Sequence, residues 1–386
     1  IENGSGGFDL IGLQIENGFG IVNIGTPHAN ESVLPRDIRL IRCALLGNEN
    51  GRTRRGVTAT AKGVYMDGCH IGRNIMGPEA ESQAFASFSG IGDYHIQHCY
   101  LEAAGENVII GGSPTLLKDW SETNVTFDHC IMTKKLEEWR PRHWDFPFRV
   151  KNLFELKRGR NVKLINCHLS NSWGDQSGAG IVITIRCEHN KNPWAVIDGL
   201  HIENCHLTGT MRGIGFLGRD YNSKFSGACR NIRILNSIFD VCGNSNIPQG
   251  HTESGLSFSC GVEDVTFERN TVLCRSGYIG LNLDSTPTNK PPTDPDFVAE
   301  YPMKRLSIRD NIIRGTLAAR GGGGKVGWNR FTRESTLAGN AVIGPGWGAV
   351  TGTDGNRTMT NSEALDDNLN SKLPGVGCDT SKFPVW

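Results

Sequence analysis

The 386-residue sequence lacks several features that mark large classes of proteins. It has no apolar run of roughly 18 residues or more, which excludes a membrane-spanning helix. Its 40 basic and 40 acidic residues give a formal net charge of +0, so no whole-molecule field attracts nucleic acid or an anionic membrane. Long stretches with helical periodicity are missing too. We therefore expect a β-rich protein whose partner is neither nucleic acid nor membrane.

The twelve cysteines show no CxxC pair and no Cys/His spacing of the zinc type. Six of them occupy one position of a recurring segment, at 43, 69, 99, 130, 167 and 205. The same position holds Ser237, Asn270 and Asn311 in later copies. A position that accepts Cys, Ser and Asn needs a small side chain more than a disulfide partner. We therefore predict buried thiols and no metal site.

The recurring segment reads as a short alternating strand, a polar pause and a second short strand, as in NVTFDHCIMT at 124–133 and NVKLINCHLS at 161–170. The pause positions 43, 69, 99, 130, 167, 205, 237, 270 and 311 give intervals of 26, 30, 31, 37, 38, 32, 33 and 41 residues. A constant segment at variable spacing is typical of a solenoid whose loops differ between turns. A further apolar strand, such as GIVITI at 180–185, precedes many copies. Each turn should therefore carry about three strands.

In a parallel coil, equivalent residues of neighbouring turns stack about 4.8 Å apart. We predict that the pause residues form one vertical column, in which Asn bonds main-chain groups of the bend and Cys fills the same volume. FDLIGLQIENG at 8–18 is interpreted as one more copy without the polar pause. A bare solenoid edge invites pairing, so we expect upstream sequence or an oligomeric partner to cover the first turn.

This pattern resembles the right-handed parallel β-helix of the pectin-lyase-like superfamily from about residue 8 to 345. Three segments, at 100–112, 150–173 and 174–184, are also similar to uncharacterised bacterial and phage right-handed β-helix repeat proteins. The resemblance implies an all-β solenoid of about ten turns over 1–345, followed by a tail at 346–386 that packs back on the last turns. It implies no particular activity.

The longest intervals, between Cys130 and Cys205, mark the turns with the largest loops, and loops usually carry binding residues. Tryptophans concentrate in this region, and their flat apolar faces can stack on sugar rings. The alternative is that they pack the loops onto the coil. The candidate substrate-binding residues are Trp139, Trp144, Trp173, Asp175 and Trp194.

Four charged residues on adjacent turns are the candidates for catalysis: Glu106, Glu155, Lys157 and Arg186. In the strand NLFELK, Phe154 and Leu156 should point inward, which leaves Glu155 and Lys157 on the outside. Two carboxylates can hydrolyse a glycosidic bond, and a cation beside a uronate can assist elimination. The alternative is an ion-pair ladder that stabilises stacked strands.

Motifs of the known polysaccharide enzymes are incomplete. NVTFDHC resembles the WIDH strand of pectate lyases and Gly250-His251 the GHG strand of polygalacturonases, but their arginine and carboxylate motifs are missing. No cofactor is required by these residues. The acidic stretches at 294–296 and 366–367 offer oxygen ligands for Ca²⁺, although short acidic loops usually face solvent.

Two functions stay open at this point. One is an extracellular enzyme, a polysaccharide lyase or glycoside hydrolase, acting in a groove across the turns at 100–220. The other is a non-catalytic module of a virion or cell surface that binds a glycan or spaces other domains. Both predict a glycan partner, and both allow a homo-oligomer or an upstream domain.

Overall fold

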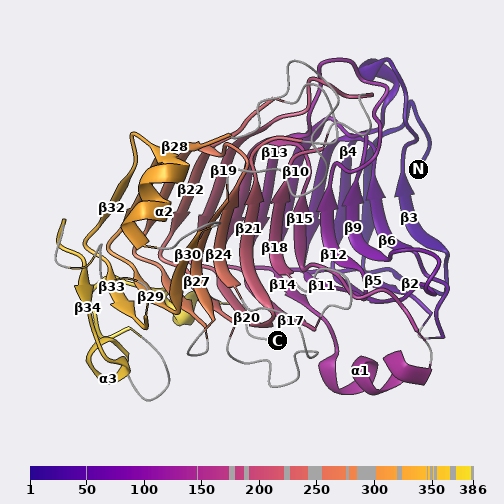
Figure 1. The fold of residues 1–386 in the computed structure, drawn as a ribbon. Coiled ribbons are helices and arrows are strands. Elements are labelled where there is room, and N and C mark those ends of the chain that lie inside the picture. The colour runs from indigo at the N-terminus through magenta and orange to yellow at the C-terminus, as the bar shows by residue number, and fades with distance from the viewer. Residues whose placement is uncertain are drawn as a thin grey trace.

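The computed structural model describes residues 1–48, 50–145, 147–173, 179–186, 191–220, 227–241, 254–274, 278–284, 301–319, 324–345, 347, 351, 354–365 and 371–383. Three parallel sheets wrap around one axis, and the chain visits them in turn before it starts the next coil (Figure 1). The parallel β-helix predicted from the repeats is therefore confirmed. No helix in the described ranges has the length and apolar character needed to cross a membrane.

Sheet A contains β1 (Gly6–Ile11), β4 (Arg36–Ile41), β7 (Lys62–Asp67), β10 (Gly92–Gln97), β13 (Thr123–Asp128), β16 (Gly159–Ile165), β19 (Ile197–Glu203), β22 (Cys229–Leu235), β25 (Glu263–Glu268), β28 (Met303–Arg309), β31 (Thr332–Arg333) and β32 (Thr336–Ala338). Sheet B contains β2 (Gln14–Glu16), β5 (Ala44–Leu46), β8 (His70–Asn74), β11 (Tyr100–Ala103), β14 (Ile131–Thr133), β17 (His168–Ser172), β20 (His206–Thr210), β23 (Ile238–Asp240), β26 (Thr271–Leu273), β29 (Ile312–Arg314), β33 (Ala341–Ile343) and β34 (Arg357–Thr358). Sheet C contains β3 (Gly20–Ile24), β6 (Arg55–Ala59), β9 (Gln83–Ser87), β12 (Glu106–Ile110), β15 (Phe154–Leu156), β18 (Ala179–Thr184), β21 (Arg212–Leu217), β24 (Ser254–Ser259), β27 (Ile279–Asp284) and β30 (Thr316–Ala319). The helices are η1 (Glu31–Val33), α1 (Leu136–Asp145), α2 (Gly324–Phe331), α3 (Asn361–Ala364) and η2 (Thr380–Lys382).

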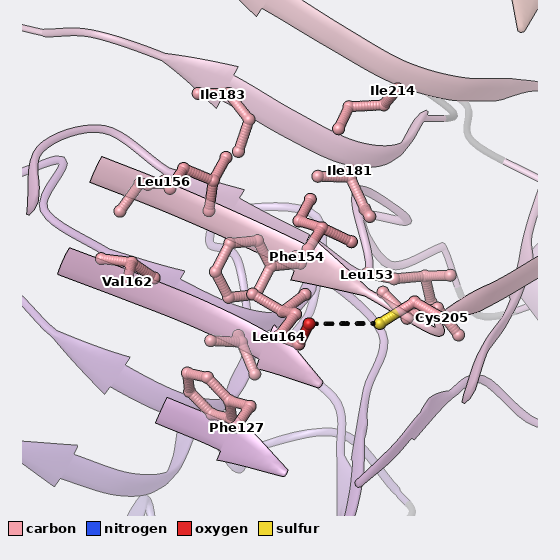
Figure 2. Close-up of a cluster of buried hydrophobic side chains, with 14 of the residues drawn as sticks. Phe127, Leu153, Phe154, Leu156, Val162, Leu164, Ile181, Ile183, Cys205 and Ile214 are labelled. Atoms are coloured by element: carbon pink, nitrogen blue, oxygen red, sulfur yellow. Dashed lines mark hydrogen bonds between the residues drawn. The ribbon is translucent and has the colours of Figure 1, made fainter. Parts of the chain in front are cut away.

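The core lies inside the coil and runs along its whole length. Inward side chains alternate with outward ones on every strand, as the period of two requires. Phe127 of β13 packs edge-to-face on Phe154 of β15, with ring centroids 5.8 Å apart. Figure 2 shows these rings among aliphatic side chains contributed by several coils. Burial of this continuous apolar column is the main force that holds the coils together.

The predicted column of small side chains is present at the corner between sheets A and B. All six cysteines of the repeat are buried free thiols. The thiol of Cys205 donates to the carbonyl of Leu164 at 3.4 Å (Figure 2). Toward the C-terminus, Asn311 accepts from the amide of Asn270 at 2.8 Å and donates to the carbonyl of Phe267 at 2.9 Å. The column therefore satisfies the main-chain groups of each bend.

The polar pause in the sequence has a backbone cause. The residue just before the column adopts a left-handed conformation in successive coils, with φ of 65° at Gly12, 48° at His98, 53° at Asn166 and 55° at Asp310. Asn, Asp, His and Gly tolerate this region better than apolar residues do. The left-handed residue makes the sharp corner, and the small residue after it fits inside.

The two ends of the coil differ. In the first coil, Phe8 continues an inward column and is 47% exposed, whereas its partner in the next coil, Ile38, is fully buried. At the other end, Trp328 and Phe331 of α2 pack into the core cluster. Sheet B ends with β34, which pairs in parallel with β33.

The C-terminal segment packs back on the outer face of sheet B. Leu365 is buried against Leu273 and Ile312 of that face. The amide of Asp379 donates to the side chain of Asn204 at 2.5 Å, which places this segment several coils back along the solenoid. The described residues of the tail thereby cover part of sheet B.

Candidate functional site

The outer face of sheet C carries most of the predicted catalytic residues in register. The first residues of successive strands form one row, in which Arg55 pairs with Gln83 and Gln83 with Glu106. Further along the solenoid, Arg212 pairs with Ser254 in the equivalent strand positions. A second row contains Ile109, Glu155 and Val182. Glu106 and Glu155 lie in different rows, and both contact the ammonium of Lys151, while Lys157 contacts Glu155 within the same strand.

Lys151 is the centre of the charged cluster, and the sequence analysis missed it. Its ammonium lies 2.5 Å from a carboxylate oxygen of Glu106, 3.2 Å from Glu81 and 3.7 Å from Glu155. Gln83 donates a further hydrogen bond to Glu106 at 2.8 Å. Glu106 is completely buried, so both of its oxygens are satisfied by protein groups.

Glu155 points outward from β15, as predicted, but is only 5% exposed. One of its oxygens lies 3.3 Å from the ammonium of Lys157, and the other accepts from Asn152 at 3.2 Å. These contacts match the ion-pair ladder that was the alternative to catalysis. Both interpretations therefore use the pair Glu155 and Lys157.

The two buried carboxylates differ in protonation. Burial, the largest single influence, would raise the pKa of Glu106, but the ammonium of Lys151 and the hydrogen bonds from Lys151, Gln83 and Glu155 together outweigh it and lower that pKa to about 2. Burial and the negative charge of Glu106 together raise the pKa of Glu155. Adjacent carboxylates that differ in this way are the arrangement that acid–base chemistry uses. A structural pair of like charges in one pocket produces the same difference.

A buried lysine, Lys134, holds the turn that precedes the strand of Glu106. The ammonium of Lys134 donates to the carbonyls of Ala103 at 2.8 Å and Gly105 at 2.6 Å, and to the side-chain oxygen of Asn107 at 2.6 Å. Burial lowers the pKa of Lys134 to about 7. These bonds fix the turn that leads into β12, and so they fix the start of the strand that carries Glu106.

An open trough begins on the strand next to Glu155. It encloses about 420 Å³ on the outer face of β18, β21, β24 and β27. Its floor is formed in part by Val182 and Leu217, and a Cβ added to Gly215 would meet nothing within 4 Å. The polar side chains that line it are Thr184, Arg212, Ser254, Ser257, Ser259 and Asn282.

Arg186 lies next to Lys157 in the following coil, because its backbone amide donates to the carbonyl of Lys157 at 3.1 Å. Its guanidinium forms an ion pair with the buried Asp220 at 3.3 Å. Asp175, the loop carboxylate predicted to bind substrate, lies outside the described residues.

The prediction that tryptophans form a sugar platform is wrong for two of them. Trp139 of α1 is completely buried, and Trp173 is 5% exposed. Both belong to one apolar cluster with Phe148 that packs the helix onto the coil. Trp194 is half-buried, and the side chain of Trp144 lies outside the described part of the structure. The alternative interpretation, loop packing, accounts for Trp139 and Trp173.

Metal binding has no support in the described ranges, where no group of three or more His, Cys, Asp or Glu side chains could hold an ion. The acidic stretches at 294–296 and 366–367 lie outside those ranges. Calcium binding there stays a prediction.

No protein-family model and no curated protein matches this sequence. Among solved structures, the chain is similar to the PL6 family alginate lyase AlyGC at 12% identity and a TM-score of 0.37, over 100% of this chain and 54% of that one. It is also similar to the tailspike protein of E. coli bacteriophage HK620, solved with a hexasaccharide, at 10% identity and a TM-score of 0.27, over 92% of this chain and 72% of that one. The chain thus spans about half the length of the alginate lyase. Likenesses this weak carry no inference about chemistry, so the strand pairing of the chain itself is what establishes the parallel β-helix solenoid.

Proposed function

We propose that this protein is an extracellular glycan-binding protein, displayed on a virion or cell surface, and that the glycan lies in the trough on sheet C. The observation that carries the proposal is the composition of that trough. Hydroxyl and amide side chains stand in rows at the spacing of the coils, between apolar surfaces of Val182 and Leu217. Sugars present the same alternation of hydroxyl groups and apolar C–H faces. Sites of this kind use few polar groups to fix orientation.

The trough itself provides the test. Gly215→Phe would place a ring in the open space above the floor without a clash, because nothing lies within 4 Å of its Cβ position. We expect this variant to fold normally and to lose binding on an array of neutral, uronate-containing and sulfated polysaccharides. Thr126→Phe, on the outer face of sheet A, is the matched control and should bind as the unmodified protein does. Equal binding by all three proteins would refute the trough as the site.

Cleavage of the glycan is a second candidate function, favoured by the pair Glu155 and Glu106. Glu155 has a raised pKa and pairs directly with Val182 of the trough floor, so it stands where a general acid could reach a bound chain. Lys157 would then steady the charge that develops on the sugar.

The assay is release of reducing ends, together with the absorbance of unsaturated products. We expect Glu155→Gln to abolish product formation while binding and thermal stability persist. Binding without any product from the unmodified protein would refute cleavage and leave the non-catalytic surface module.

A further inference from the structure

We infer that Arg212 selects a glycan that carries an anionic group, a carboxylate or a sulfate, and this inference rests on the proposed glycan site in the trough. Arg212 is exposed at the start of β21 and lines the trough. In the part of the chain that the structure describes, it forms no ion pair. Its guanidinium is therefore free to meet a ligand.

Another arginine in the same row of side chains, Arg55, does have hydrogen-bond partners within the protein. Near the N-terminal end, Arg55 donates to Gln83 at 3.3 Å, and Gln83 donates to Glu106. The charges of Arg55 and Glu106 are thus linked through Gln83. Arg212 stands in the equivalent position three strands after Glu106, between Ala179 and Ser254, and neither neighbour offers a negative charge.

Among the described residues that line the trough, none carries a carboxylate. Its other polar lining groups are the hydroxyls of Thr184 and three serines and the amide of Asn282. Asp284 lies at the last position of β27, next to Ser259, whereas Arg212 is at the first position of its strand. The two positions are five residues apart along the strand direction, or about 16 Å at the rise of a β-strand. A guanidinium fork holds a carboxylate or sulfate through two parallel hydrogen bonds, and the hydroxyls around it suit the sugar.

The test compares an oligogalacturonate with the same oligosaccharide after reduction of its carboxyl groups, and adds a sulfated galacto-oligosaccharide. We expect the unmodified protein to bind at least one charged probe more tightly than the neutral one. Arg212→Met should weaken that binding about ten- to hundredfold, the usual effect of losing a hydrogen bond to a charged group, and leave neutral binding unchanged. Which charged probe binds distinguishes carboxylate from sulfate. Arg233→Met, an exposed arginine on the outer face of sheet A, is the matched control.

The outcomes separate this inference from the proposed function. Equal affinity for charged and neutral probes, or no effect of Arg212→Met, overturns the role of Arg212 and leaves glycan binding intact. Absence of binding to every probe, in both proteins, overturns the proposed function and the inference with it. Binding to charged probes that Arg233→Met weakens as much as Arg212→Met does would indicate non-specific attraction and would also overturn the inference.

Discussion

Substitutions of two neighbouring glutamates, Glu106→Gln and Glu155→Gln, should have unequal consequences for stability. Glu106 has a folded pKa of about 2 against a reference value of 4.5, and Glu155 has a folded pKa above that reference. Glu106 therefore stabilises the folded state as a carboxylate, whereas the folded state favours the protonated form of Glu155. Glutamine keeps the shape of both side chains and removes only the charge.

The size of the effect follows from the shift at Glu106. A difference of about 2.5 pKa units corresponds to roughly 3 kcal/mol at 1.36 kcal/mol per unit. Glu106→Gln should therefore cost about 2–3 kcal/mol at pH 7, since Lys151 keeps Glu81 and Glu155 as weaker partners. Glu155→Gln should lie within about 1 kcal/mol of the unmodified protein, because it removes a charge that burial disfavours.

The pH dependence of stability tests independently whether each glutamate stabilises the fold in its charged or its neutral form. Because the folded pKa of Glu106 lies below its unfolded value, its contribution is complete above about pH 4.5 and is lost as the pH falls toward 2. Glu155 acts in the opposite sense, since acid protonates it more readily in the folded state. Urea unfolding between pH 3 and 7, or unfolding rates where refolding fails, would measure both. A loss of stability in Glu155→Gln as large as that in Glu106→Gln would refute the assignment of charge within the pair.

Three further predictions concern the surroundings of the site. Asn311→Ala should lower the free energy of unfolding by roughly 2–5 kcal/mol, because the amide of Asn270 and the carbonyl of Phe267 lose buried partners. Cys205→Ala should lower it by only about 1 kcal/mol. Equal losses would contradict the proposed role of the column in bonding the main chain. Lys134 has a pKa of about 7 in the folded state and 10.5 in the unfolded state, so the unfolded state binds more protons between these values and stability should rise from pH 7 to 10. In urea titrations, Lys134→Met should flatten this rise. The same rise in the variant would refute the prediction. Trp139→Ala should lower the free energy of unfolding by about 3–5 kcal/mol and leave glycan affinity unchanged, because the side chain is buried. A loss of glycan affinity without a loss of stability would show that Trp139 contributes to the binding site.

The fold could be predicted because its signal is local and repeated. Each coil needs a left-handed residue followed by a small buried one. In most coils the sequence therefore has Asn, His, Asp or Gly before Cys, Ser or Asn, although Arg42 and Arg269 also adopt the left-handed conformation. Each apolar alternation that flanks the pair is short, but the same order recurs along the chain. Repetition therefore identifies the column before any coordinates are known.

The site was harder to predict because its residues meet through register, and register depends on loop length. Glu155 and Lys157 share one strand, so their contact follows from the alternation alone. Lys151 lies just before that strand, in a stretch with no periodic pattern, and only the folded loop brings it to Glu106. The backbone of Arg186 does lie beside Lys157, but its guanidinium forms an ion pair with Asp220, which no pattern in the sequence indicated.

The tryptophans failed as predictors for an energetic reason. A loop that returns to the coil must bury apolar surface to offset the entropy lost when it is ordered. Trp139 and Trp173 supply that surface where α1 meets the coil, so the residues most suited to stack on a sugar were already used to hold the loop. Arg212 makes no such contribution to the core, and its exposure has no counterpart in loop packing. Groups that the fold does not need are the better indicators of a ligand, which is why Arg212 and not Trp139 is the residue on which glycan recognition should be tested first.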